Sequence, residues 1–101
     1  MVLKIENITA EPFQRHEIIT DNGNVIITLK FHDVIAIWTI DAERNGRTVQ
    51  GVKLSVGVTH IQSSLLGVDF IVYAQGDVDP YKLNDFESGR CSLLMGVLDA
   101  V

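Results

Sequence analysis

Stiff β-branched side chains, gathered in short runs between turn signals, are the feature that most constrains the fold of this chain. Valine, isoleucine and threonine account for 29 of its 101 residues, and such side chains favour pleated strands over helices. A chain of this length forms one domain. Residues 1–101 are therefore predicted to be a single all-β domain, a small β-barrel or sandwich of about six to seven short antiparallel strands. The turn signals are Asp21-Asn22-Gly23, Asn45-Gly46, Gly57, Gly67, Gly76-Asp77, Asp79-Pro80 and Ser88-Gly89.

Alternating side chains indicate which faces of the strands point inward. In the third predicted strand the odd-numbered residues are apolar and face the core, and in the fifth the even-numbered Val52, Leu54 and Val56 do so. In the fourth strand Ala36, Trp38 and Ile40 share one face. The predicted strands are Val2–Ile8, Phe13–Thr20, Val25–Phe31, Ile35–Ala42, Thr48–Val56, Phe70–Ala74 and Arg90–Val97.

Three segments lack a clear strand pattern. Residues 1–11 are predicted to be an N-terminal extension or an edge strand. The segment His60–Leu66 has no alternation and is predicted to be a loop or one helical turn. Residues 76–89 are rich in Asp, Asn, Gly and Pro and are predicted to form a long, solvated acidic loop.

The register of the central hairpin depends on the length of its turn. A two-residue loop would place Trp38 opposite Lys53 and turn the apolar face of the fifth strand away from the core. We therefore predict a three-residue loop, Arg44-Asn45-Gly46, in which Gly46 is left-handed. That loop gives the pairs Trp38–Val52 and Ala36–Leu54.

Charge and hydropathy exclude several classes of function. Eight basic residues against thirteen acidic ones give a net charge of −5, which argues against binding nucleic acid, since that needs clustered Lys and Arg. No apolar run approaches the roughly 20 residues of a membrane helix. Charges at Lys4 and Glu6 precede any signal-peptide core, so we expect the protein to be cytoplasmic or to be assembled in the cytoplasm.

The sequence predicts no metal or cofactor site. His16, His32, His60 and Cys91 are far apart and form no zinc-binding spacing, and the single cysteine has no partner for an internal disulfide. Asp77-Val78-Asp79 begins like a calcium-binding loop. The positions that should hold Gly and Glu are lysine and serine instead, so this motif fails.

The residues that could support catalysis also lack the required context. Ser63-Ser64 lies near His60, but no G-x-S-x-G turn surrounds it. The chain has many scattered carboxylates, so some two of them can always be proposed as a catalytic acid and base. Without further context such a pair is a coincidence of composition. The protein is predicted not to be an enzyme. The carboxylates considered are Glu6, Glu11, Glu17 and Asp41.

Trp38 admits two interpretations. It could be a platform on which a ligand stacks, or it could anchor the core of the central hairpin. Its own face is otherwise aliphatic, with Ala36 and Ile40 as neighbours. Because burying an aromatic ring on such a face is strongly favourable, we interpret Trp38 as a core residue.

The order of motifs between about Val25 and Val97 resembles the small baseplate plug family of contractile-tailed phages, first met in a cyanophage. That family has a strand with tryptophan and aspartate, a D-G or N-G turn, a strand of the form G-hydrophobic-K/R-L, and a late DL-G-x-R-x-x-L segment. The matching segments here are Phe31-His32-Asp33, Ile37–Asp41, Asn45-Gly46, Val49–Gly57, Asn84-Asp85-Phe86 and Arg90–Leu94.

The resemblance implies a structural component of the tail baseplate, located in the virion and without catalytic residues. It implies other baseplate, tail-tube, hub or spike proteins as partners, and we expect a ring-forming homo-oligomer. The alternative is a stand-alone small β-barrel that binds a ligand, although the seven aromatic residues are too scattered to predict an aromatic groove. The residues given a structural role are Trp38, Asp41, Asn45, Gly46, Gly51, Leu54 and Gly57.

The apolar strands at the two ends of the chain are predicted to be sheet edges. Edge strands carry unpaired backbone groups that another chain can pair with. We therefore expect the first ten residues and the segment Arg90–Val97 to contact other subunits.

Overall fold

The computed structural model describes residues 2–21, 23–57 and 66–97. His60, Ser63 and Ser64, and most of the segment predicted as a loop or helical turn, lie outside the described residues. The described part contains seven strands and one short 3-10 helix, Gln75–Asp77. The strands are β1 (Val2–Lys4), β2 (Phe13–Ile18), β3 (Val25–His32), β4 (Ile37–Arg44), β5 (Arg47–Lys53), β6 (Val68–Ala74) and β7 (Cys91–Val97).

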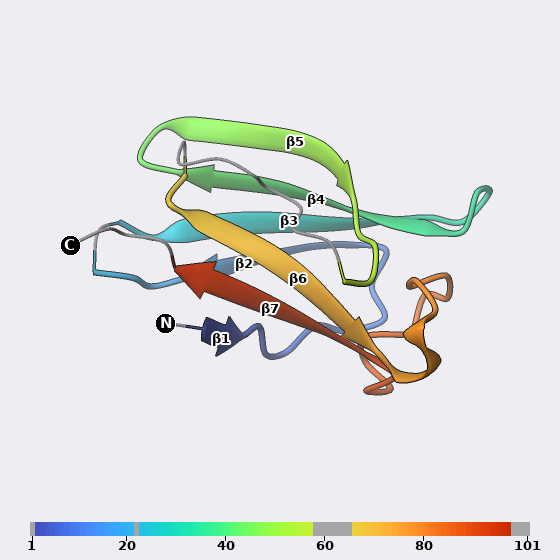
Figure 1. The fold of residues 1–101 in the computed structure, drawn as a ribbon. Helices are drawn as coiled ribbons and strands as arrows, with labels where there is room; N and C mark the ends of the chain where they lie inside the picture. Colours follow the sequence, from blue (N-terminus) through green and yellow to red (C-terminus); the bar gives the residue numbers. More distant parts are fainter. Residues whose placement is uncertain (1, 22, 58–65, 98–101) are drawn as a thin grey trace.

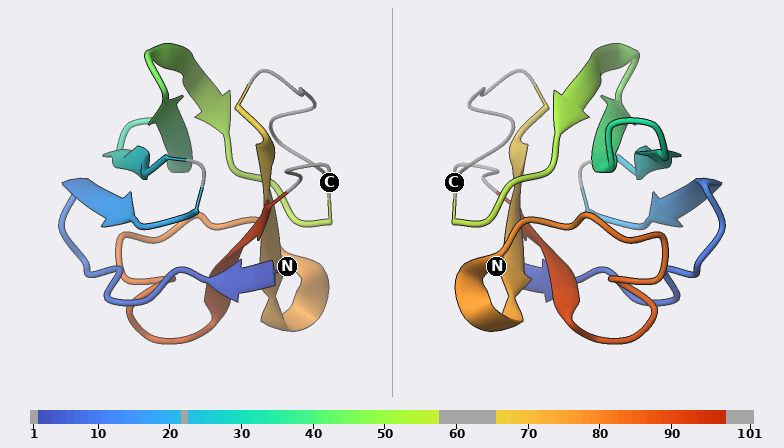
Figure 2. Two further views of the ribbon diagram at one scale, coloured as in Figure 1. Left: turned by 90° about the vertical axis from the view of Figure 1, so that its left-hand side faces the viewer. Right: turned by 90° about the vertical axis from the view of Figure 1, so that its right-hand side faces the viewer.

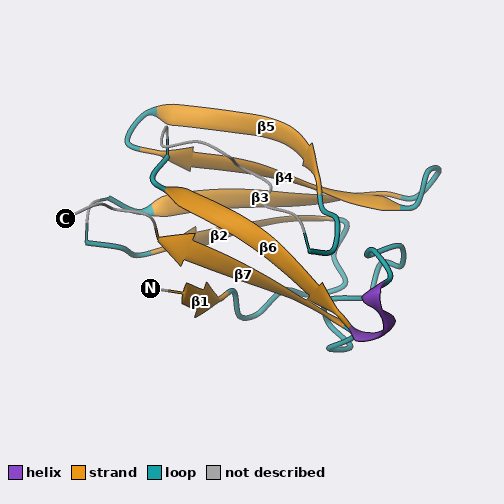
Figure 3. Ribbon diagram, viewed as in Figure 1, coloured by secondary structure: helices purple, strands orange, loops and turns teal. Residues whose placement is uncertain are grey.

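The strands form two antiparallel sheets packed face to face (Figure 1; Figure 3). One has three strands in the order β1-β7-β6, and the other has four in the order β2-β3-β4-β5. The chain passes from one sheet to the other between β1 and β2 and again between β5 and β6. The predicted all-β class is confirmed, and the architecture is a sandwich.

Alternate side chains of both sheets fill the space between them. In β3 the odd-numbered Val25, Ile27 and Leu29 are fully buried, as the periodicity predicts. The three-stranded sheet contributes alternate residues such as Phe70 and Leu93. The core also holds Ile5, Trp38, Ile40, Ala42, Leu54, Leu66, Val68, Val72, Ala74, Phe86, Cys91 and Met95.

The central hairpin differs from the prediction at its turn. Arg44 pairs directly with Arg47, so the loop has two residues, and both Asn45 (φ 54°) and Gly46 (φ 78°) are left-handed. Such a loop matches the right-handed twist of the flanking strands. The predicted three-residue loop is therefore wrong, although the positive φ expected at Gly46 is present.

A β-bulge near Gly51 explains why the two-residue loop does not expose the apolar face of β5. The register shifts between Ile40 and Ala42, so that one extra residue of β5 lies opposite β4. Gly51 has φ 70°, which a glycine adopts readily. Beyond the bulge Ile40 pairs with Val52, so the predicted pairing of Trp38 with Val52 is wrong.

The same shift sets the partners of Trp38 and Ala36. The Leu54 N–H donates to the Trp38 carbonyl over 2.9 Å, so Leu54 lies beside Trp38 rather than beside Ala36. Ala36 is left-handed, with φ 54°, and lies in the turn before β4. It therefore does not belong to the face that Trp38 and Ile40 share.

The order of strands corrects the prediction for Arg90–Val97. β7 is the central strand of its sheet, paired with β1 on one side and with β6 on the other. Its backbone cannot accept a further strand. The N-terminal strand is an edge, as expected, because β1 pairs only with β7 among the described strands.

Candidate functional site

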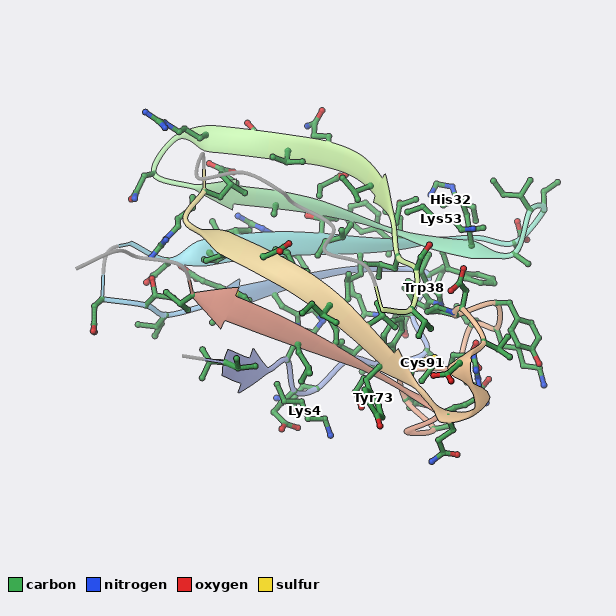
Figure 4. The ribbon with its side chains drawn as sticks, in the orientation of Figure 1. Lys4, His32, Trp38, Lys53, Tyr73 and Cys91 are labelled. Atoms are coloured by element: carbon green, nitrogen blue, oxygen red, sulfur yellow. The ribbon has the colours of Figure 1, made fainter. Side chains whose placement is uncertain are left out.

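Trp38 joins the central hairpin to the loop that precedes β7. Its side chain is fully buried and lies between the sheets (Figure 4). It contacts the rings of Phe31 and Phe86, with centroid distances of 5.3 Å and 5.5 Å. The indole N–H donates to the Lys82 carbonyl over 3.1 Å. Trp38 is thus a core residue that also fixes the position of a distant loop.

Asp41 holds the bulge of β5. Its Oδ1 accepts the Gly51 N–H over 2.7 Å, and its Oδ2 lies 3.0 Å from the Lys30 ammonium. Partial burial raises the pKa of Asp41, but the hydrogen bonds from Gly51 and Lys30 outweigh it and leave the pKa below its ordinary value. The carboxylate therefore stays charged and fixes the extra residue in place.

The remaining residues given a structural role extend the same hairpin. Asn45 and Gly46 form its turn, and Leu54 is buried beside Trp38. Gly57 is left-handed, with φ 74°, and its N–H donates to the Val72 carbonyl over 3.3 Å, where the chain crosses to the other sheet. The structure places all seven residues along the segment that runs from β4 to this crossing.

An aspartate that the sequence analysis did not single out as a site residue organises the loop of residues 78–90. Asp85 is only 2% exposed. Its carboxylate accepts two hydrogen bonds from Arg90, over 2.9 Å and 2.8 Å. It also accepts the backbone N–H groups of Tyr81 and Lys82 over 2.7 Å and 2.8 Å. The Arg90 hydrogen bond is the main reason that the pKa of Asp85 falls to about 2.

Arg90 uses its remaining donors to bind the far side of the loop. Its guanidinium donates to the carbonyls of Val78 and Asp79 over 3.0 Å and 3.1 Å. Its guanidinium carbon also lies 5.1 Å from the centre of the Tyr81 ring. The expected solvated acidic loop is therefore built around a buried ion pair. The sequence did carry a signal for this ion pair. Asp85 and Arg90 stand at the D and R positions of the family pattern DL-G-x-R-x-x-L.

The loop and the β3–β4 turn display apolar side chains at one end of the sandwich. Val34 is 94% exposed, and Ile35 beside it is also exposed. The 78–90 loop adds Val78, Tyr81 and Leu83, all exposed. Figure 1 shows both segments at the end of the molecule opposite the marked chain termini.

Apolar side chains also gather on the outside of the three-stranded sheet, where they surround Lys4, the cross-strand partner of Leu94. We call Val2, Ile71, Tyr73 and Leu94 the apolar face. Ile71 and Leu94 are cross-strand partners, and Tyr73 and Val2 lie diagonally beside Leu94 on the outer strands. Tyr73 is 71% exposed and projects away from the four-stranded sheet (Figure 4).

The outer side of the four-stranded sheet combines the exposed Phe13 with several bonded polar side chains. Lys30 and Asp41 form an ion pair there, and the His32 ring shares a 2.9 Å hydrogen bond with the Thr39 hydroxyl. Polar side chains that bond to one another reduce the apolar area that this surface offers to another protein. The two sheets thus present different outer surfaces.

Of the residues considered for chemistry, the described histidines and Cys91 lie apart, whereas Glu6 and Glu17 line one groove. Cys91 is buried at the start of β7, and burial raises the pKa of its thiol to about 11. His16 bonds to Gln14 over 2.9 Å, whereas His32 lies on another strand. Among the described residues, no group of three or more His, Cys, Asp or Glu side chains could hold a metal ion. Of the helices in the described ranges, none has the length and apolar character needed to cross a membrane.

Three clefts bear on the alternative of a ligand-binding barrel. They have volumes of about 300, 380 and 140 Å³. The only aromatic residue that lines any of these three is Phe86, which is itself buried. The exposed Phe13, Tyr73 and Tyr81 lie on β2, on β6 and in the 78–90 loop. These clefts do not form the aromatic groove that this alternative requires.

The chain matches a known protein family over most of its length. The sequence profile of the family described as "Cyanophage baseplate Pam3 plug gp18" matches residues 2–97. A search of the curated proteins finds no match to this chain. The family match covers every strand of the sandwich together with the 78–90 loop.

Proposed function

Because the chain belongs to the cyanophage baseplate plug family, we propose that it is a structural subunit of a contractile-tail baseplate that acts through contacts with neighbouring subunits. The observation that carries this proposal is the apolar face of the three-stranded sheet. Exposed apolar side chains that gather on one surface are typical of protein interfaces. Tyr73 is the central residue of this proposal, since exposed tyrosines anchor interfaces at low entropic cost.

The 78–90 loop supports the same function at another surface. Asp85 and Arg90 hold its backbone before any partner is bound. A loop that is already ordered loses less conformational entropy on binding. Tyr81 and Leu83, which it exposes, are therefore the second contact that we propose.

The proposed partners are other baseplate, tail-tube, hub or spike proteins in the virion, with copies of this chain arranged as a ring. The N-terminal strand and the last strand contribute to these proposed contacts in a different way from the one that the sequence predicted. β1 provides a free edge and the exposed Val2, whereas β7 has no free edge and contributes only outward side chains such as Leu94 and Ser92. Ile5 belongs to the core, so deleting residues 1–9 would damage the fold as well as any interface.

A charge placed on the apolar face tests this function. We expect Tyr73→Lys to prevent incorporation of the protein into tails, because the lysine would be buried unpaired at the interface. The measurement is the amount of this chain in tails purified from a phage that lacks its own copy and is supplied with the variant. Thr48→Lys, on the exposed outer side of β5, is the matched control and should incorporate normally. Normal incorporation of a folded Tyr73→Lys protein, checked by circular dichroism, contradicts the proposal.

A further inference from the structure

The two sheets of the sandwich leave a groove between the edge strands β1 and β2. The groove has a volume of about 380 Å³. One wall comes from β1 and the residues just after it, and the other from the end of β2. Figure 2 shows β1 and β2 as separate strands of the two layers. The residues that matter for the argument are Leu3, Lys4, Glu6, Glu17, Ile18 and Ile19.

Both walls carry backbone groups that point into the groove. The Ile5 N–H donates to the Leu93 carbonyl, so alternation along β1 directs the backbone of Lys4 away from β7. The Phe31 N–H donates to the Pro12 carbonyl, which by the same alternation directs the backbone of Glu17 away from β3. Within the described residues, no hydrogen bond is recorded for these outward groups of Lys4 and Glu17. One unpaired edge is enough for strand addition, and each wall of the groove offers one.

The side chains of the groove define what it can accept. Leu3 and Ile18 are partly buried against the core, whereas Ile19 is 81% exposed. Glu6 and Glu17 are exposed carboxylates in the lining, with the Lys4 ammonium as the one strongly basic group among the groove residues. Apolar side chains on an incoming strand would cover the isoleucines and leucine. A basic side chain would offset the excess negative charge.

We infer that the groove between β1 and β2 binds an extended segment of another baseplate protein, in which apolar residues alternate with a basic one. This inference rests on the proposed function, because it names a kind of partner for a baseplate subunit. The three residues of β1 limit the paired length to about 10 Å. The chain itself carries a net charge of −5, so charge favours a different protein over a second copy.

Peptide binding to the isolated, full-length protein tests the inference. The probes are short capped peptides that tile the proteins of the purified phage tail, this chain included, and fluorescence anisotropy measures their affinity. We expect binders in which apolar residues alternate with Lys or Arg. Glu17→Pro removes an outward N–H without removing a bond to β3, and should weaken binding about tenfold. Glu17→Gln should weaken peptide binding less than Glu17→Pro does, and the affinity of this variant should depend less on salt concentration.

Thr48→Pro is the matched control, because Thr48 also lies on an edge strand, at the other side of the four-stranded sheet. It should leave peptide binding unchanged. If Glu17→Pro fails to fold, Glu17→Gln and peptides with Lys replaced by Glu give the same test. The inference is overturned if no peptide binds, if both Glu17 variants bind normally, or if only peptides from this chain bind. None of these results affects the Tyr73→Lys experiment, which tests the baseplate function by itself.

Discussion

Asp85 accepts two backbone N–H groups and Asp41 accepts one, and each also contacts one basic side chain, but the two carboxylates lie in different surroundings. Asp85 is buried and accepts two hydrogen bonds from Arg90. Asp41 is partly exposed and contacts the flexible ammonium of Lys30. A charge removed from water depends on its partners for all of its solvation, whereas an exposed one retains water. We therefore expect loss of the Asp85–Arg90 pair to disorder the 78–90 loop. Loss of the Asp41–Lys30 pair should affect only the bulge at Gly51.

The largest effect is expected when the buried pair is broken. Asp85→Asn removes the charge opposite Arg90 and leaves an uncompensated guanidinium inside the loop. The free energy of unfolding should fall by about 3–5 kcal/mol, measured by urea denaturation. Asp77→Asn is the matched control, because Asp77 is exposed at the edge of the same loop. It should change stability by less than about 0.5 kcal/mol. Equal effects for the two variants would contradict the difference between the sites.

Acid should reveal the same buried pair with a smaller effect. The pKa of Asp85 is lowered, mainly by Arg90, from 3.8 to about 2 in the folded protein. A carboxyl group whose pKa is lower in the folded protein stabilises the folded state at pH values above its unfolded pKa. This stabilisation is lost as the pH falls through the pKa of the folded state. Between about pH 5 and pH 2 the folded state should lose about 2 kcal/mol from this group. Asp85→Asn should have a correspondingly flatter stability profile over that range. An unchanged profile would show that Asp85 is not the titrating group.

The smallest effect is expected at the exposed pair. Lys30→Met keeps much of the aliphatic side chain and removes the ammonium that lies 3.0 Å from Asp41. Because both side chains remain in contact with water, stability should fall by less than about 1 kcal/mol. A double-mutant cycle with Asp41→Asn isolates the interaction between the two groups. A coupling as large as the loss in Asp85→Asn would remove the distinction between the two aspartates.

Local patterns in the sequence determined which segments are strands and which of their faces are buried. Alternation in Val25–Phe31 predicted the inward residues of β3, because side chains on a strand alternate with a period of two. The apolar residues of the predicted strand Thr48–Val56 likewise required an inward Val52 and Leu54. The motif order between Val25 and Val97 indicated the baseplate plug family, which the profile match to residues 2–97 confirms.

The tertiary structure decided which segments meet. Hydrophobic alternation is the same in an edge strand and a central one, so it could not show that β7 lies between β1 and β6. It also could not distinguish a longer turn from a bulge at Gly51, since either keeps Val52 facing inward. The partners of Asp85 are local in sequence, since Tyr81, Lys82 and Arg90 lie within five residues of it, but only the fold shows that this carboxylate is buried. Burial, strand order and the groove between β1 and β2 arise from contacts between distant segments, and local patterns carry no information about them.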